Sequence, residues 1–141
     1  MIIRGKIVYV YDIEVFQNIF HCSVKNTETN NIYKFEISER KNQLRELVKF
    51  FKQVDKYITW GDYYTTNINI PANVIFCGYN NLHYDNPIIN YIIEYEDKLM
   101  QYNIPTICSS IFNLSKTITT SSEDNIDAWK HWKYQIWFDT F

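Results

Sequence analysis

Three strand-like segments in close succession constrain the fold of this 141-residue chain more than any other feature. Residues 6–13 read K-I-V-Y-V-Y-D-I, a run of β-branched and aromatic side chains that predicts a buried strand. Segments 19–25 and 32–37 have the same character, and only short polar breaks separate the three. Connections this tight favour an antiparallel meander.

Helical and strand-like segments alternate after the meander. Apolar residues recur at helical spacing from 41 to about 56, with Ser38 as the expected N-terminal cap. A fourth strand, apolar on both faces and therefore central and parallel to its neighbour, is expected at 74–79. A helix with Pro87 in its first position is expected to follow, as far as about residue 102 and before Pro105.

Residues 106–120 are compatible with either a helix or a loop, and 134–139 predict a last strand. This order of segments predicts an α/β fold. Its mixed sheet would combine an antiparallel meander with βαβ crossovers, and helices would cover both faces. No internal repeat is visible, so we expect one domain over residues 1–141.

The composition excludes several classes of protein. Apolar residues make up 46% of the chain and charged residues 21%, which is typical of a soluble globular domain. The three glycines argue against a glycine-rich phosphate loop. No signal peptide is visible, and no apolar run approaches the roughly 18 residues that a membrane-spanning helix needs. We therefore expect a soluble intracellular protein with no membrane partner.

The cysteines and histidines do not suggest a zinc site or a nucleophilic triad. Cys22, Cys77 and Cys108 lie far apart and are odd in number, so buried free thiols are expected rather than a disulfide framework. The three histidines are scattered, and none forms a metal-ligand pair with a cysteine.

Two carboxylates stand two residues apart at the end of the first predicted strand. Asp12 and Glu14 would share one face of the sheet, because side chains at i and i+2 of a strand point the same way. Two like charges this close repel each other, and a divalent cation such as Mg²⁺ or Mn²⁺ would offset that cost. The alternative is that both simply point into solvent.

A third carboxylate follows the fourth predicted strand. The turn G-Y-N-N-L-H-Y-D, residues 78–85, places Asp85 at the carboxyl end of that strand and just before a helix. Ligands of open α/β sheets gather at this end of the strands. The alternative is that Asp85 or Asn86 only caps the helix.

Together, D-x-E in the first strand and N-x-x-Y-D after the fourth resemble the first two exonuclease motifs of family B DNA polymerases. The resemblance is closest to the protein-primed and related phage-type enzymes, with Asn81, Tyr84 and Asp85 in register. Residues 137–141, W-F-D-T-F, also resemble the strand that follows in those domains, so the resemblance spans nearly the whole chain. It implies a ribonuclease H-like fold and an N-terminal 3′→5′ proofreading exonuclease domain.

The resemblance also implies a role for each residue. Asp12, Glu14 and Asp85 would be the catalytic carboxylates and would bind two Mg²⁺ or Mn²⁺ ions, with Asp12 bridging them and Asp85 holding the second. Asn81 and Tyr84 would hold the 3′ end of single-stranded DNA. His83 lies in the same motif and could contact a phosphate, although a loop histidine without a catalytic role is the plainer interpretation.

The chain departs from the family in one respect. Family members carry a third motif, Tyr-x-x-x-Asp, and no aspartate here has a tyrosine four residues before it. The domain is thus expected to be incomplete at its C-terminus. The chain would be a fragment, one piece of a split polymerase, or a shortened relative that has lost the reaction. Its partner would be the remainder of a DNA polymerase, and we expect little or no nuclease activity from the chain alone.

Two further segments allow more than one interpretation. Residues 129–134, W-K-H-W-K-Y, could line a path for single-stranded DNA or pack against other protein. The predicted helix at 41–56 has a basic face that could meet phosphates or simply be solvated, formed by Lys41, Arg45, Lys49, Lys52 and Lys56.

Two alternatives to a proofreading exonuclease remain. One is a non-catalytic ribonuclease H-like module that binds single-stranded DNA or docks onto a polymerase. The other is a different ribonuclease H-like nuclease. In each case we expect a cytoplasmic location, which is the host cytoplasm if the protein is viral.

Overall fold

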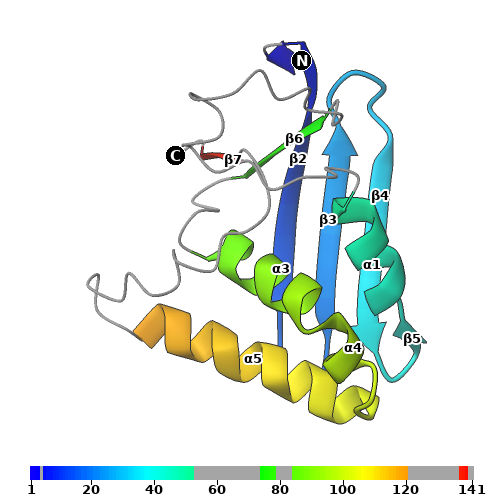
Figure 1. Ribbon diagram of the computed structural model, residues 1–141, viewed down its shortest axis with the longest axis vertical. Helices are drawn as coiled ribbons and strands as arrows, with labels where there is room; N and C mark the ends of the chain where they lie inside the picture. Colours follow the sequence, from blue (N-terminus) through cyan, green and yellow to red (C-terminus); the bar gives the residue numbers. More distant parts are fainter. Residues whose placement is uncertain (4, 53–73, 79–83, 121–136, 140–141) are drawn as a thin grey trace.

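The structure is a computed structural model that describes residues 1–3, 5–52, 74–78, 84–120 and 137–139. The described strands form a single mixed sheet in the order β5-β4-β3-β2-β6-β7, with β1 paired to β2 (Figure 1). The strands are β1 (Ile2–Ile3), β2 (Lys6–Val15), β3 (Phe20–Asn26), β4 (Ile32–Ser38), β5 (Lys41–Asn42), β6 (Val74–Gly78) and β7 (Trp137–Asp139).

The predicted meander is confirmed. Strand β3 runs antiparallel to both β2 and β4, so that Ile13 pairs with Cys22 and Cys22 with Phe35. The turn between β3 and β4 contains Asn30 with a positive φ of 61°. Asparagine tolerates this left-handed conformation better than most residues do. The polar break in the sequence therefore marks a turn with a defined backbone requirement.

The predicted central strand is also confirmed. Strand β6 lies between β2 and β7 and runs parallel to both. Its side chains are buried on both faces: Phe76 is completely buried, and its neighbour Ile75 is 2% exposed. A strand covered on both sides requires the continuous apolar run that the sequence shows.

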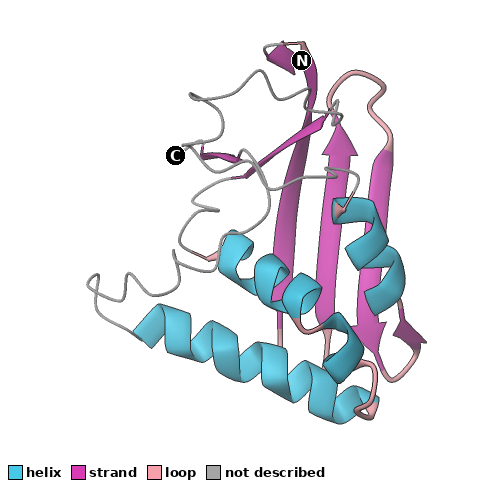
Figure 2. Ribbon diagram, viewed as in Figure 1, coloured by secondary structure: helices cyan, strands magenta, loops and turns pink. Residues whose placement is uncertain are grey.

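The described helices are α1 (Leu44–Phe51), α3 (Asp85–Glu94), α4 (Glu96–Leu99) and α5 (Ile104–Thr120) (Figure 2). Residues 106–120, which the sequence made compatible with either a helix or a loop, form most of α5. Pro105 lies beyond the end of α4, as predicted, and is also the second residue of α5. A proline fits the first turn because the N–H that it lacks has no partner within the helix there.

The start of α1 differs from the prediction. Lys41–Asn42 pairs with β4 as the short strand β5, and the helix begins only at Leu44 after Gln43. Ser38 does not cap this helix; its hydroxyl donates to the carboxylate of Glu36, 2.7 Å away. The hydroxyl that was predicted to cap the helix is therefore bonded to an acidic side chain of the same strand.

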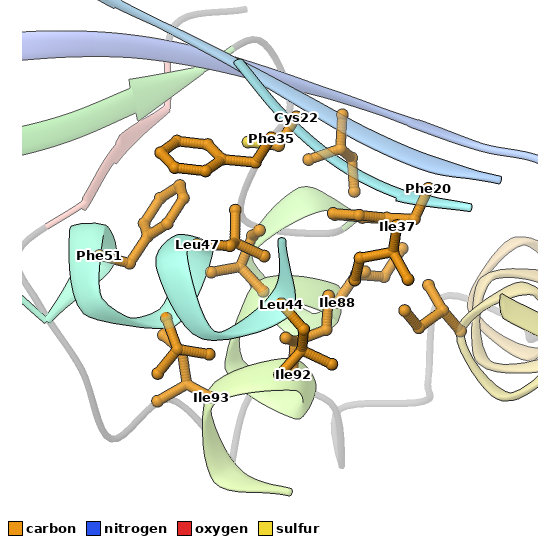
Figure 3. Packing of buried hydrophobic residues seen from close by; sticks show 14 of the residues in the cluster. Phe20, Cys22, Phe35, Ile37, Leu44, Leu47, Phe51, Ile88, Ile92 and Ile93 are labelled. Carbon is orange, nitrogen blue, oxygen red and sulfur yellow. The ribbon is translucent and has the colours of Figure 1, made fainter. Parts of the chain in front are cut away.

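The core lies between the sheet and the helices (Figure 3). Its strand residues are alternate ones, such as Tyr11 and Ile13 of β2 and Phe20 and Cys22 of β3, so they share one face. Apolar residues of all four described helices pack on that face, among them Leu47, Ile92, Leu99 and Ile111.

The prediction of helices on both faces is not met by the described helices. From Tyr9 to Glu14, strand β2 alternates between buried and exposed side chains. Such alternation is typical of a sheet with one face open to solvent. The prediction of a buried strand at residues 6–13 did not include this alternation.

All three cysteines are free and buried, as predicted. None of the helices that the structure describes is long and apolar enough to cross a membrane.

The basic face of α1 is partly neutralised by α4. Nη1 of Arg45 lies 2.8 Å from a carboxylate oxygen of Asp97 and 3.1 Å from one of Glu96, and Nζ of Lys52 lies 3.9 Å from the other oxygen of Glu96. These contacts join two helices of one layer. Two of the basic side chains are therefore engaged within the protein.

Candidate functional site

Asp12 and Glu14 share one face of β2 and are both exposed. In the ladder with β3, Asp12 lies opposite Ser23 and Glu14 opposite His21, whereas Ile13 between them pairs with the buried Cys22. The two carboxylates therefore project from the face opposite to the helices. Their shared face is the arrangement that the i, i+2 spacing predicts.

A histidine that the sequence analysis set aside lies beside this pair. His21 of β3 is the ladder partner of Glu14 on β2 and of Glu36 on β4, so the three residues form a row across the sheet. The sequence contains no signal for this row, because it depends on the register of two strand pairs.

Asp85 is the first residue of α3 and is 5% exposed. The residue at the N-cap is Tyr84, so neither Asp85 nor Asn86 has the capping role that was the alternative interpretation. An acidic side chain in the first turn is stabilised by the partial positive charge of the helix N-terminus.

The ring of Tyr84 is positioned by α5. Its phenol oxygen lies 2.7 Å from the hydroxyl of Ser115, in a hydrogen bond that ties the start of α3 to the middle of α5. Asn81 and His83, the other two candidate substrate-binding residues, lie outside the described residues, as does the aromatic and basic segment 129–134.

The two parts of the candidate site are joined through neighbouring parallel strands. Strands β2 and β6 are parallel partners, with Val10 opposite Cys77 near the end of β6. Asp12 lies two residues beyond Val10, and Asp85 follows the end of β6 along the chain. The end of β6 therefore lies beside the part of β2 that carries Asp12, and Asp85 begins the next described helix along the chain.

The pKa of the buried thiol of Cys22 is influenced by two of the candidate carboxylates. The pKa of Cys22 is raised well above its usual value, chiefly by burial and then by the negative charges of Asp85 and Asp12. A charge influences a buried group in this way only from nearby, because the interaction weakens with distance. Both negative charges thus act on the same buried thiol.

The donors suit a hard divalent cation only in part. Asp12 and Glu14 are two carboxylates on one face, and Mg²⁺ in proteins is often held by one or two carboxylates together with substrate phosphates. Within the described segments, however, no group of three or more His, Cys, Asp or Glu side chains is arranged to hold a metal ion. The structure thus brings Asp12 and Glu14 together on the face of the sheet away from the helices, whereas Asp85 begins a helix that packs on the other face.

Comparison with known proteins does not place the chain in a family. No protein-family model matches it, and neither a curated protein nor a solved structure does so.

Proposed function

We propose that the chain is the N-terminal portion of a 3′→5′ DNA exonuclease of ribonuclease H-like fold, the proofreading part of a DNA-directed DNA polymerase. One observation carries the proposal: β6 ends at Gly78, one residue past the partner of Val10, so the end of this parallel strand lies beside the part of β2 that carries Asp12, and Asp85 follows it along the chain. Ligands of open α/β sheets bind at such strand ends. The meander followed by parallel strands is also the sheet expected from the sequence resemblance.

The proposed roles follow from the chemistry of the side chains. Asp12 and Glu14, exposed side by side, would provide the first carboxylate ligands, and Asp85 would approach from the start of α3. Mg²⁺ or Mn²⁺ ions bound there would lower the pKa of a water molecule and stabilise the oxygen that leaves the phosphodiester. The substrate phosphate would complete the ligand set, which is how Mg²⁺ sites on nucleotides are commonly built.

The substrate would be the 3′ end of single-stranded DNA. Tyr84 would offer its ring to a terminal base, because stacking contributes about 1–3 kcal/mol per base without selecting its identity. The hydrogen bond to Ser115 would hold that ring in one orientation. Asn81 and His83 of the same motif would contact the terminal nucleotides.

We further propose that the 141-residue chain is weak or inactive by itself and acts with the rest of a polymerase in the cytoplasm. The third motif of the family would add a fourth carboxylate and a tyrosine to the site, and this sequence lacks that motif. Fewer ligands mean weaker metal binding, since each carboxylate contributes charge to the site.

Thermal unfolding in the presence of Mn²⁺ tests the proposal. A ligand that binds only the folded state raises its stability, by about 2.7 kcal/mol at a concentration 100 times the Kd. Mn²⁺ is expected to raise the Tm of the wild type and not that of Asp12→Asn or Glu14→Gln. The matched control is Asp97→Asn, because Asp97 is an exposed aspartate whose described ion pair is with Arg45 of α1.

Binding of a 3′-labelled single-stranded oligonucleotide should be measured on the same variants. Equal Mn²⁺ responses in the wild type and in Asp12→Asn, together with retained DNA binding, would contradict the exonuclease and favour a non-catalytic module. Metal-dependent nucleotide release by the isolated chain, abolished by Asp12→Ala, would instead overturn only the expectation of low activity.

A further inference from the structure

A pocket of about 440 Å³ lies between the α3–α4 segment and α5, and none of the candidate carboxylates lines it. Pockets that bind small organic molecules have volumes of roughly 300–1,000 Å³. Part of the lining is apolar and comes from α3, α4 and α5: Pro87, Leu99, Leu114 and Ile118. The volume and the apolar lining suit a compact organic ligand.

One wall of the pocket is aromatic. Tyr91 and Tyr95 lie with their ring centroids 5.1 Å apart and their planes at 48°, and Tyr102 also lines the pocket. Tyr95 is 42% exposed and Tyr102 38%, so these rings can be reached from solvent. Tyrosine rings at a pocket wall stack on flat aromatic molecules, which gain apolar contact and a favourable ring–ring geometry.

A cation lies on the same wall. The ammonium of Lys98 is 5.9 Å from the centroid of the Tyr95 ring, and Lys98 makes no ion pair with an acidic side chain in the described part of the chain. Its positive charge also acts on the phenol of Tyr91. The pKa of Tyr91 is raised overall, mainly by burial, and a hydrogen bond with Ser110 and the charge of Lys98 oppose part of that rise. Glu94, the acidic residue of the described lining, already takes part in an interaction of its own.

We propose that this pocket binds a small aromatic anion, whose flat ring stacks on Tyr91 and Tyr95 and whose carboxylate or phosphate pairs with Lys98. The ring of the ligand would contact the tyrosine rings and the apolar side chains of the pocket. Its acidic group would pair with Lys98, which has no acidic partner among the described residues. An aromatic carboxylate and a nucleoside monophosphate share this chemistry. The site is separate from the proposed exonuclease and does not depend on it.

Isothermal titration of the full 141-residue chain tests the proposal. The probes are 5′-AMP and indole-3-acetate, each compared with its uncharged counterpart, adenosine or indole. EDTA in every titration prevents binding through divalent metal at the carboxylates. At least one anion is expected to bind, and more tightly than its uncharged counterpart. Tighter binding of 5′-AMP would identify a phosphate as the preferred acidic group of the ligand, and tighter binding of indole-3-acetate would identify a carboxylate.

Three variants locate the binding. Lys98→Met should weaken binding of the anion roughly tenfold, which corresponds to about 1.4 kcal/mol, and leave its uncharged counterpart unaffected, because the variant keeps the apolar stem and loses only the charge. Tyr95→Leu should weaken both, and Leu114→Trp should abolish both by filling the pocket. Lys49→Met, at an exposed position of α1, is the matched control for the loss of one charge and should bind as the wild type does.

Asp12→Asn should also bind the probes as the wild type does, which separates this site from the carboxylates. Lys98 and Tyr95 are exposed, so these two variants should fold even if Leu114→Trp does not. The proposal is overturned if neither anion binds, or if binding is unchanged in both Lys98→Met and Tyr95→Leu.

Discussion

The phenol of Tyr11 donates a hydrogen bond to the side-chain oxygen of Asn86, which joins the buried face of β2 to the first turn of α3. Tyr11 precedes Asp12 in the chain, and Asn86 follows Asp85. One buried hydrogen bond therefore connects the two segments that carry the candidate carboxylates. It sets their spacing without involving either carboxylate.

Tyr11→Phe is expected to destabilise the protein by about 1 kcal/mol. The change removes the donor of this buried hydrogen bond, and the net contribution of one such bond to stability is about 0.5–1.5 kcal/mol. Urea unfolding measures the loss. Tyr33→Phe removes the same hydroxyl from a half-buried ring for which no hydrogen bond of that hydroxyl is described, and should change stability little. Equal losses in the two variants would contradict the importance of the Tyr11–Asn86 bond.

Asn90→Leu is expected to stabilise the protein. Asn90 is 1% exposed, and neither atom of its amide has a hydrogen-bond partner in the described structure. Burying an unpaired polar group costs about 1–3 kcal/mol, and leucine of similar size removes that cost. The comparison is Asn86→Leu, the same change one helical turn earlier, which breaks the bond to Tyr11 and should destabilise. A loss of stability in Asn90→Leu, measured by thermal unfolding, would reveal a partner for its amide.

Stability should fall in acid partly through Glu36. Its pKa is lowered from 4.5 to about 2, first by hydrogen bonds from Arg40 and then by one from Ser38. Because the pKa of the folded state is depressed, the carboxylate contributes full stability above its unfolded value, and the contribution disappears as the pH falls from about 4.5 to about 2.

Glu36→Gln should therefore lose stability at pH 6 and show a shallower decline over that acid range, as followed by urea midpoints from pH 6 to pH 2. Arg40→Gln should also make the decline of the urea midpoint over this range shallower. The double variant should lose little more stability than either single variant, because both changes break the same pair. Parallel curves for Glu36→Gln and the wild type would assign the acid dependence to other carboxylates.

The three thiols should not react in the native state. Cys22 is completely buried and Cys108 is 1% exposed, and burial raises the pKa of both. Because the thiolate is the reactive form, a raised pKa and a covered sulfur both slow modification. A disulfide reagent at pH 8 should label no cysteine until urea unfolds the chain. Rapid labelling of a single thiol without denaturant would show that the structure opens locally.

The sequence by itself was enough to predict the α/β class, the meander and the central parallel strand. Each depends on local information: β-branched runs of strand length, polar turns such as Asn30-Asn31, and an apolar run bounded by Gly78. The shared face of Asp12 and Glu14 also followed from the sequence, because alternation is a property of any strand. What they bind stays a prediction.

Only the tertiary structure decided which groups meet across the chain. Tyr84 bonds to Ser115, His21 lies between Glu14 and Glu36, and no local pattern contains these contacts. The pocket between α3–α4 and α5 arises in the same way, from helices that pack on one face of the sheet. Local propensity sets the elements, whereas register and packing set the distances between residues far apart in sequence, since these depend on burying the core as a whole.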